Sequence, residues 1–204
     1  MYAMVRKYAG KGGLLDRLAP QVRDGLVPML RRAPGFKGYC AFASEDGHLI
    51  SVSVFDDRQS AVRANEQARG WVVSNLGGLL PDPPEVLAGE ALLHEVSRPQ
   101  GGGGAEMFAT IRVYEGVGPE EEVLPWVREH VFLTITGAPG FRGYYAFLDE
   151  RDASWGVSAS LFDTREHAME ANRWVLEVMR DRSIAPNPPS VMAGRVVLAA
   201  LAEG

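Results

Sequence analysis

Apolar and polar residues alternate at the start of the chain, which is the pattern of a β-strand. Within residues 2–8, Ala3 and Val5 fall on one face, because successive side chains of a strand point to opposite sides. The other face carries larger and more polar residues: Tyr2, Met4, Arg6 and Tyr8. The same alternation returns at residues 108–114, where Arg112 takes the place of Arg6. The pattern therefore predicts two similar strands far apart in the chain.

A helix is predicted after each of these strands, over residues 14–32 and 120–136. The second one begins with three consecutive glutamates, which suit the positive end of a helix dipole. Pro20 and Pro125 occupy matching positions, so both helices are expected to start late or to kink there. A Pro-Gly pair then ends each helix.

A hairpin and a second helix complete each half. Alternating residues predict strands at 38–43 and 49–55, and again at 143–148 and 155–162. Asp56 and Asp163 follow, each with Gln or Glu three residues later, which is the spacing of a capping box. An alanine-rich helix comes next in both halves. The final strands are predicted at residues 86–93 and 191–198.

The two halves also resemble each other residue by residue. The block Ala-Pro-Gly-Phe-Lys-Gly-Tyr-Cys-Ala-Phe at 33–42 returns at 138–147 with eight of its ten positions identical. Four consecutive glycines between the halves are typical of a flexible tether. We therefore predict a tandem duplication with a first unit at residues 1–96, a linker at 97–106 and a second unit at 107–204.

The order β-α-β-β-α-β in each half predicts an α+β fold built from two ferredoxin-like units. Helices should cover one face of each antiparallel sheet. The face with tyrosine, methionine and phenylalanine also needs a cover, and we expect the sheet of the other unit to supply it. One chain would then form an intramolecular version of a dimeric α+β barrel, either as a monomeric pseudo-dimer or as a homodimer of such chains.

The charge and composition of the chain exclude several classes of binding partner. The net charge of −5 offers no basic excess for nucleic acid. Cys40 is the single cysteine, so an intrachain disulfide and a thiolate metal cluster are excluded. The most apolar stretch, residues 191–202, is interrupted by Arg195 and is too short to span a bilayer. We expect a cytoplasmic protein without a membrane partner.

The repeated Pro-Gly-Phe-x-Gly-Tyr segment, at residues 34–39 and 139–144, resembles the dimeric α+β barrel superfamily. The strand that ends in Phe-Asp before an alanine-rich helix is similar to the antibiotic biosynthesis monooxygenase-like branch. The resemblance covers nearly the whole chain, twice. It implies the fold directly, and it implies small-molecule chemistry such as oxygenation without a cofactor. The Asn/Trp/His set of the haem-degrading members does not map onto this sequence.

Candidate ligand-binding residues come from the polar positions of the predicted strands and second helices: Arg6, Tyr8, Ser51, Ser53, Asn65, Arg112, Tyr114, Ser158, Ser160 and Asn172. The arginines could hold a phenolate, enolate or carboxylate in a cavity between the sheets, or each could pair with an acid. The serines could bind a ligand or simply leave space, and the asparagines could satisfy buried backbone groups. Further tyrosines could line the cavity or belong to the core: Tyr39, Tyr144 and Tyr145.

Catalytic residues are not assigned by the sequence. His130 or His167 could act as a general base if one half keeps a cavity, or both could be surface residues. The histidine spacing predicts no metal site, and no cofactor is expected. The expected partner is a small hydrophobic or aromatic molecule, and two functions of the protein remain open. One is a monooxygenase-like enzyme or isomerase on an enolisable substrate, and the other is a non-catalytic binding or scaffold protein.

Overall fold

The structure is a computed structural model that describes residues 1–97 and 106–202. Most of the predicted linker therefore lies outside the described residues. Contacts divide the chain into unit 1, which comprises residues 1–90 and 196–204, and unit 2, which comprises residues 91–195. Each unit thus takes in a short segment from beyond the sequence boundary of its own half.

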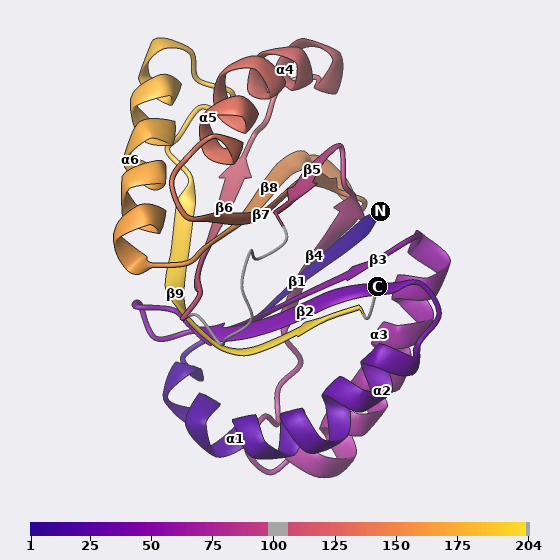
Figure 1. Cartoon of the computed structure of the whole chain (residues 1–204). Helices are drawn as coiled ribbons and strands as arrows, with labels where there is room; N and C mark the ends of the chain where they lie inside the picture. The colour runs from indigo at the N-terminus through magenta and orange to yellow at the C-terminus, as the bar shows by residue number, and fades with distance from the viewer. Residues whose placement is uncertain (98–105, 203–204) are drawn as a thin grey trace. The chain divides into compact units, whose positions relative to one another are not determined.

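Unit 1 is an antiparallel sheet with helices on one face (Figure 1). Its strand order is β4-β1-β3-β2-β9, where β9 contributes its final residues from Val196 onward. The elements, in chain order, are β1 (Tyr2–Tyr8), η1 (Gly12–Leu14), α1 (Leu15–Gln21), η2 (Val22–Leu26), α2 (Val27–Arg32), β2 (Phe36–Ala43), β3 (Leu49–Phe55), α3 (Arg58–Leu76) and β4 (Glu85–Glu90).

Unit 2 begins with an additional strand, β5, and then follows a similar order of elements without a counterpart of η1. Its strand order is β9-β6-β8-β7-β5, and all neighbouring strands are antiparallel. The chain passes through β5 (Leu93–Val96), β6 (Phe108–Glu115), α4 (Glu120–Trp126), η3 (Val127–Phe132), α5 (Leu133–Thr136), β7 (Phe141–Asp149), β8 (Asp152–Phe162), α6 (Arg165–Asp181) and β9 (Ser190–Leu201). The predicted α+β composition is therefore confirmed.

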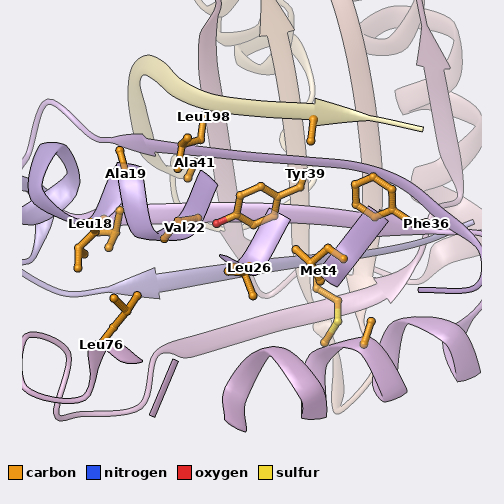
Figure 2. Packing of buried hydrophobic residues seen from close by; sticks show 14 of the residues in the cluster. Met4, Leu18, Ala19, Val22, Leu26, Phe36, Tyr39, Ala41, Leu76 and Leu198 are labelled. Carbon is orange, nitrogen blue, oxygen red and sulfur yellow. The ribbon is translucent and has the colours of Figure 1, made fainter. Parts of the chain in front are cut away.

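The core of each unit lies between its sheet and its helices. In unit 1, Met4 and Tyr39 of the sheet pack with Leu18 and Val22 from the helical side (Figure 2). The core of unit 2 has the same construction and includes Phe108, Ile135, Phe141, Tyr144, Phe162 and Val175. Each fully buried large apolar side chain contributes about 1.5–3 kcal/mol, so these two layers supply much of the stability of their units.

This packing corrects the predicted orientation of the sheets. The face of β1 with Tyr2, Met4, Arg6 and Tyr8 was expected to meet another sheet, but it lies beneath the helices. The equivalent face of β6 in unit 2 also lies beneath helices, since Phe108 belongs to the core there and Arg112 bonds to α6. The alternation in a strand shows which residues share a face, but both faces here are mostly buried and both carry apolar side chains, so it could not show which one the helices cover.

The first helix of each unit continues past its proline. Pro20 lies inside α1 and Pro125 inside α4, and a π-helical turn follows in each case, η2 or η3. A proline lacks an N–H group, and the wider turn re-routes the hydrogen bonds without ending the helix. The second helices are capped one residue later than predicted. Asp57 and Thr164, rather than Asp56 and Asp163, accept the N-terminal N–H groups.

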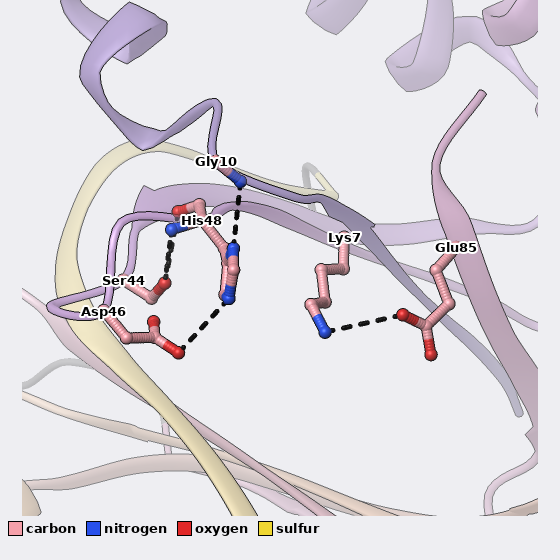
Figure 3. A network of polar contacts seen from close by, with 6 residues as sticks. All are labelled: Lys7, Gly10, Ser44, Asp46, His48 and Glu85. Carbon is pink, nitrogen blue, oxygen red and sulfur yellow. Dashed lines mark hydrogen bonds and ion pairs between the residues drawn. The ribbon is translucent and has the colours of Figure 1, made fainter. Parts of the chain in front are cut away.

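One histidine fixes the turn between β2 and β3 (Figure 3). His48 Nδ1 accepts a hydrogen bond from the Gly10 N–H at 3.0 Å, and its Nε2 lies 3.4 Å from an oxygen of Asp46. The His48 N–H in turn donates to Ser44 Oγ at 3.0 Å. Both ring nitrogens of His48 therefore have partners, and His48 has a structural role in this turn.

Cys40 in β2 gives a prediction about alkaline stability. The side chain is 7% exposed, and burial raises the pKa of its thiol to about 12. A folded-state pKa above the unfolded value of 9.0 gives stability that is complete below pH 9 and is lost as the pH rises toward 12. Relative to Cys40→Ala, the wild-type protein should lose about 1.4 kcal/mol per pH unit above 9. Urea unfolding of both proteins from pH 8 to 11 measures this difference, and parallel profiles would contradict it.

Candidate functional site

The residues predicted from the sequence form two matched clusters, one in each unit. In unit 1, Arg6 extends from β1 toward α3, where its Nε and Nη2 both donate to Asn65 Oδ1, at 3.0 and 2.8 Å. Its Nη1 donates to Ser53 Oγ at 3.1 Å, and its Nη2 also lies 3.4 Å from the sulfur of Met4. Every nitrogen of the Arg6 guanidinium therefore has a partner.

In unit 2, Arg112 is held in the same way but less completely. Its Nε donates to Asn172 Oδ1 at 2.8 Å, and its Nη1 donates to Ser160 Oγ at 3.2 Å. Its Nη2 is buried and has no hydrogen-bond partner among the described residues. Thr110 stands where unit 1 has Met4, and its buried hydroxyl likewise lacks a partner in the described part of the chain. The Arg112 guanidinium therefore has free donor capacity that the Arg6 guanidinium does not have.

Arg112 is a buried cation held by neutral groups. It is 0% exposed, and burial lowers the pKa of its guanidinium, while the nearby Tyr114 and Tyr144 act in the opposite direction. No ion pair of Arg112 with an acid occurs in the described residues, so the interpretation as an acid pair does not apply there. An uncompensated buried charge is costly, and an anionic group brought near it would be stabilised strongly.

A cavity of about 60 Å³ lies within unit 2, between the sheet and the helical side. This is several times the space that one water molecule needs, but less than half of a cavity of about 150 Å³ that holds benzene, so an aromatic ligand must move the walls outward or extend beyond this space. Tyr114, Tyr144 and Ser158 provide its hydroxyl groups, and Glu120 is a carboxylate on its lining. Most of the remaining lining is aliphatic, and representative residues are Val123, Leu124, Val127, Leu148, Val157 and Ile184. The cavity is thus an apolar space with a small polar group of atoms, the usual composition of a small-molecule site.

The polar atoms of the cavity are adjacent to Arg112. Ser158 is the direct partner of Arg112 in the β6–β8 ladder, and Tyr114 follows Arg112 by two residues on the same strand face. Burial raises the pKa of Tyr114, while Arg112 and a hydrogen bond with Ser158 lower it. Burial likewise raises the pKa of Tyr144. Both phenols are therefore protonated donors near neutral pH, directly beside a fixed positive charge.

The sequence identified only part of this cavity. Tyr114 and Ser158 line it, and Arg112, Ser160 and Asn172 form the network next to it. The aliphatic walls and Glu120 were not predicted, because residues of these types are also ordinary core or surface residues. In unit 1, Tyr8 and Ser51 lie on the same strand face as Arg6, since β1 and β3 pair Tyr8 with Leu49 and Arg6 with Ser51.

The two histidines proposed as bases are placed away from this cavity among the described residues. His130 stacks on Trp126 with ring centres 5.1 Å apart, and its Nδ1 lies 3.0 Å from the backbone oxygen of Trp126. His167 Nδ1 lies 2.7 Å from Asp163 Oδ1, at the start of α6. Neither ring lines the cavity, so neither is in position to act on a ligand bound there.

Within residues 1–97 and 106–202, no cluster of three or more His, Cys, Asp or Glu side chains is arranged to hold a metal ion. Among the described helices, none combines the length and the apolar character needed to cross a membrane.

No protein-family model matches the sequence, and no curated protein matches it by sequence. Solved structures are similar in fold. A candidate monooxygenase from Fusobacterium nucleatum superposes with a TM-score of 0.78 at 11% identity, covering 100% of this chain and 95% of that one. An anthrone oxidase-like protein gives 0.64 at 14% identity, with 100% and 94% covered.

A third similar structure is a candidate monooxygenase from Lactobacillus acidophilus, with a TM-score of 0.63 at 8% identity and with 98% of this chain and 95% of that chain covered. Identities this low establish the fold alone. The chain therefore has the α+β-barrel-like fold that these proteins share.

Proposed function

We propose that the cavity of unit 2 binds a small aromatic or enolisable molecule through an anionic or strongly polarised oxygen. The observation that carries this proposal is the buried Arg112 guanidinium, whose Nη2 has no partner among the described residues. Arg112 does not itself line the cavity, but its charge acts on Tyr114 and Tyr144, which do. The aliphatic walls accept the apolar part of the molecule, and Tyr114, Tyr144 and Ser158 are the donors nearest to its oxygen. The positive charge favours the ionised form of that oxygen.

Binding of 2-naphthol and naphthalene tests the proposal directly. The two molecules share an apolar body, but only 2-naphthol carries an oxygen that can ionise. We expect calorimetry to show tighter binding of 2-naphthol, and we expect its absorbance to show a pKa lowered by about 1 to 3 units in the complex. Equal affinities for the two molecules, with no change in ionisation, would rule out the proposed role of Arg112.

The proposed activity is a cofactor-independent, monooxygenase-like reaction. The charge of Arg112 would stabilise the enolate formed when a proton leaves the carbon next to a carbonyl group. The enolate would then supply electrons to O₂, so that a CH₂ group becomes a carbonyl group and one water molecule is released. The names of the structurally similar candidate monooxygenases and of the anthrone oxidase-like protein are consistent with such a reaction.

The alternative is a binding or scaffold protein without catalysis, and 2-tetralone separates the two. An enzyme should accelerate the exchange of its acidic CH₂ protons for deuterium in D₂O, and an oxygenase should also consume O₂. A binding protein should bind 2-tetralone and change neither rate. Arg112→Met serves as the control, because it removes the charge that the catalytic proposal requires.

A second proposal concerns the architecture of the chain. We infer that the chain is a tandem duplication of a ferredoxin-like unit and that the two units form an intramolecular α+β barrel, as a monomeric pseudo-dimer or a homodimer in the cytoplasm. Support comes from the repeated segment at residues 33–42 and 138–147 and from the Arg-Asn-Ser network found in both units. Light scattering of the purified chain measures its oligomeric state.

A further inference from the structure

The two units place different residues opposite the tyrosine that follows the buried arginine by two positions. In β1 and β3, Tyr8 pairs with Leu49. In β6 and β8, Tyr114 pairs with Gly156. The ladders are otherwise matched, because Arg6 pairs with Ser51 just as Arg112 pairs with Ser158. The same site in the sheet therefore carries a large aliphatic side chain in unit 1 and none in unit 2.

On the helical side, too, unit 1 has a larger side chain than unit 2 at a matching position. Leu18 lies two residues before Pro20, and Val123 lies two residues before Pro125. In unit 1, Leu18 and Leu49 are 1% and 6% exposed and belong to one apolar cluster. In unit 2, Val123 and Gly156 line the cavity. Unit 2 therefore has a smaller side chain at both of these positions, and both positions belong to the cavity lining.

Gly156 has little room for a side chain unless the cavity is reduced. A Cβ atom at this position would lie 2.9 Å from Val117 Cγ2 and 3.8 Å from Leu148 Cδ2 and Tyr114 Cβ. Val117, Leu148 and Tyr114 all line the cavity. Any larger residue at position 156 would therefore displace Val117 or extend into the cavity, and either change alters the cavity wall.

We propose that Gly156 opens the ligand site of unit 2 and sets the size of the ligand, and that Leu49 closes an equivalent, latent site in unit 1. This inference rests on the proposed function, because it takes the cavity of unit 2 as the binding site. Unit 1 keeps the Arg6, Ser53 and Asn65 network but fills the adjacent space with leucine. The chain thus binds one small aromatic molecule, in its C-terminal half.

Counting the molecules of 2-naphthol bound per chain tests the inference. Calorimetry should give one for the wild-type protein, none for Gly156→Val, and two for Leu49→Gly. The double variant Gly156→Val/Leu49→Gly should return to one, now with chemical-shift changes in NMR spectra at Tyr8 instead of Tyr114. Valine is chosen at position 156 because β-branched residues suit a strand.

The outcomes are distinguishable. A wild-type protein that does not bind 2-naphthol contradicts the proposed function itself. Binding by folded Gly156→Val with unchanged stoichiometry and affinity overturns the present inference and leaves the proposed function intact. A single bound molecule in folded Leu49→Gly overturns the latent site.

Milder substitutions serve if a glycine or valine variant does not fold. Val123→Leu restores the leucine of unit 1 on the opposite wall and should weaken 2-naphthol binding at least tenfold. Leu49→Ala should admit benzene-sized phenol as a second bound molecule. Unchanged binding by both of these variants would also overturn the inference.

Discussion

Replacing Arg112 with methionine is expected to weaken the binding of 2-naphthol about 10- to 100-fold and to abolish the shift in its ionisation. Methionine keeps a similar length and an apolar body, so the variant removes mainly the positive charge. That charge lies beside Tyr114 and Tyr144, where burial excludes water and strengthens electrostatic interactions. Calorimetry and absorbance titration across pH 6 to 10 measure both effects.

Arg6→Met is the matched control in unit 1. Arg6 makes the same bonds to an asparagine of the second helix and a serine of the sheet, but the adjacent positions hold leucine. It should therefore change folding stability without changing 2-naphthol binding, provided that circular dichroism shows a folded protein. Equal losses of binding in both variants would mean that the arginines act through general stability and not as part of a ligand site.

Gly140→Ala is expected to destabilise the protein by about 3 kcal/mol or more, whereas Gly35→Ala should cost about 1 to 2 kcal/mol. Gly140 directly precedes β7 and Gly35 directly precedes β2, with positive φ values of 69° and 70°, a conformation unfavourable for alanine. The two substitutions differ in cost because different atoms lie next to the two glycines. A Cβ atom at Gly140 would overlap Asp163 Oδ1 and His167 Nδ1, whereas at Gly35 it would meet Ser60 Oγ at 3.2 Å.

The His167–Asp163 pair should account for the extra cost at Gly140. In a His167→Ser background, which reproduces Ser60 of unit 1, the effect of Gly140→Ala should fall toward that of Gly35→Ala. Urea unfolding of the four proteins in the cycle gives this coupling energy. If the two glycine variants differ by less than about 0.5 kcal/mol, the pair relaxes freely and the explanation is wrong.

The grouping of the candidate residues could be predicted from the sequence because it follows from local periodicity. Arg112, Tyr114, Ser158 and Ser160 lie on one face since they occupy alternate positions of paired strands. Asn172 lies near the apolar side of its helix, and it reaches Arg112. The side of the sheet that these residues face could not be predicted in this way. It depends on where the helices pack, and the sequence offered two buried faces to choose from.

The sequence also could not show which residue caps α6 or what His167 contacts. The spacing of Asp163 and Glu166 suggested a capping box, but Thr164 caps α6 and Asp163 is 2.7 Å from His167. Several short polar side chains near a helix start can each accept its N–H groups. The choice among them depends on the exit angle of the preceding strand, and this is a property of the folded unit.

By itself the sequence determined the α+β class, the order of the helices and of most strands in each half, and the sets of residues that share a strand face. These features follow from backbone geometry, which repeats every two residues in a strand and every 3.6 in a helix. The sequence did not separate β4 from β5, which it joined in one predicted strand at residues 86–93. Only the tertiary structure decided that the arginines lie beneath helices and that unit 2 contains a cavity lined by Gly156 and Val123. A cavity is the difference between the space enclosed by packed elements and the volume of the side chains that fill it, and this difference exists only once the elements have packed.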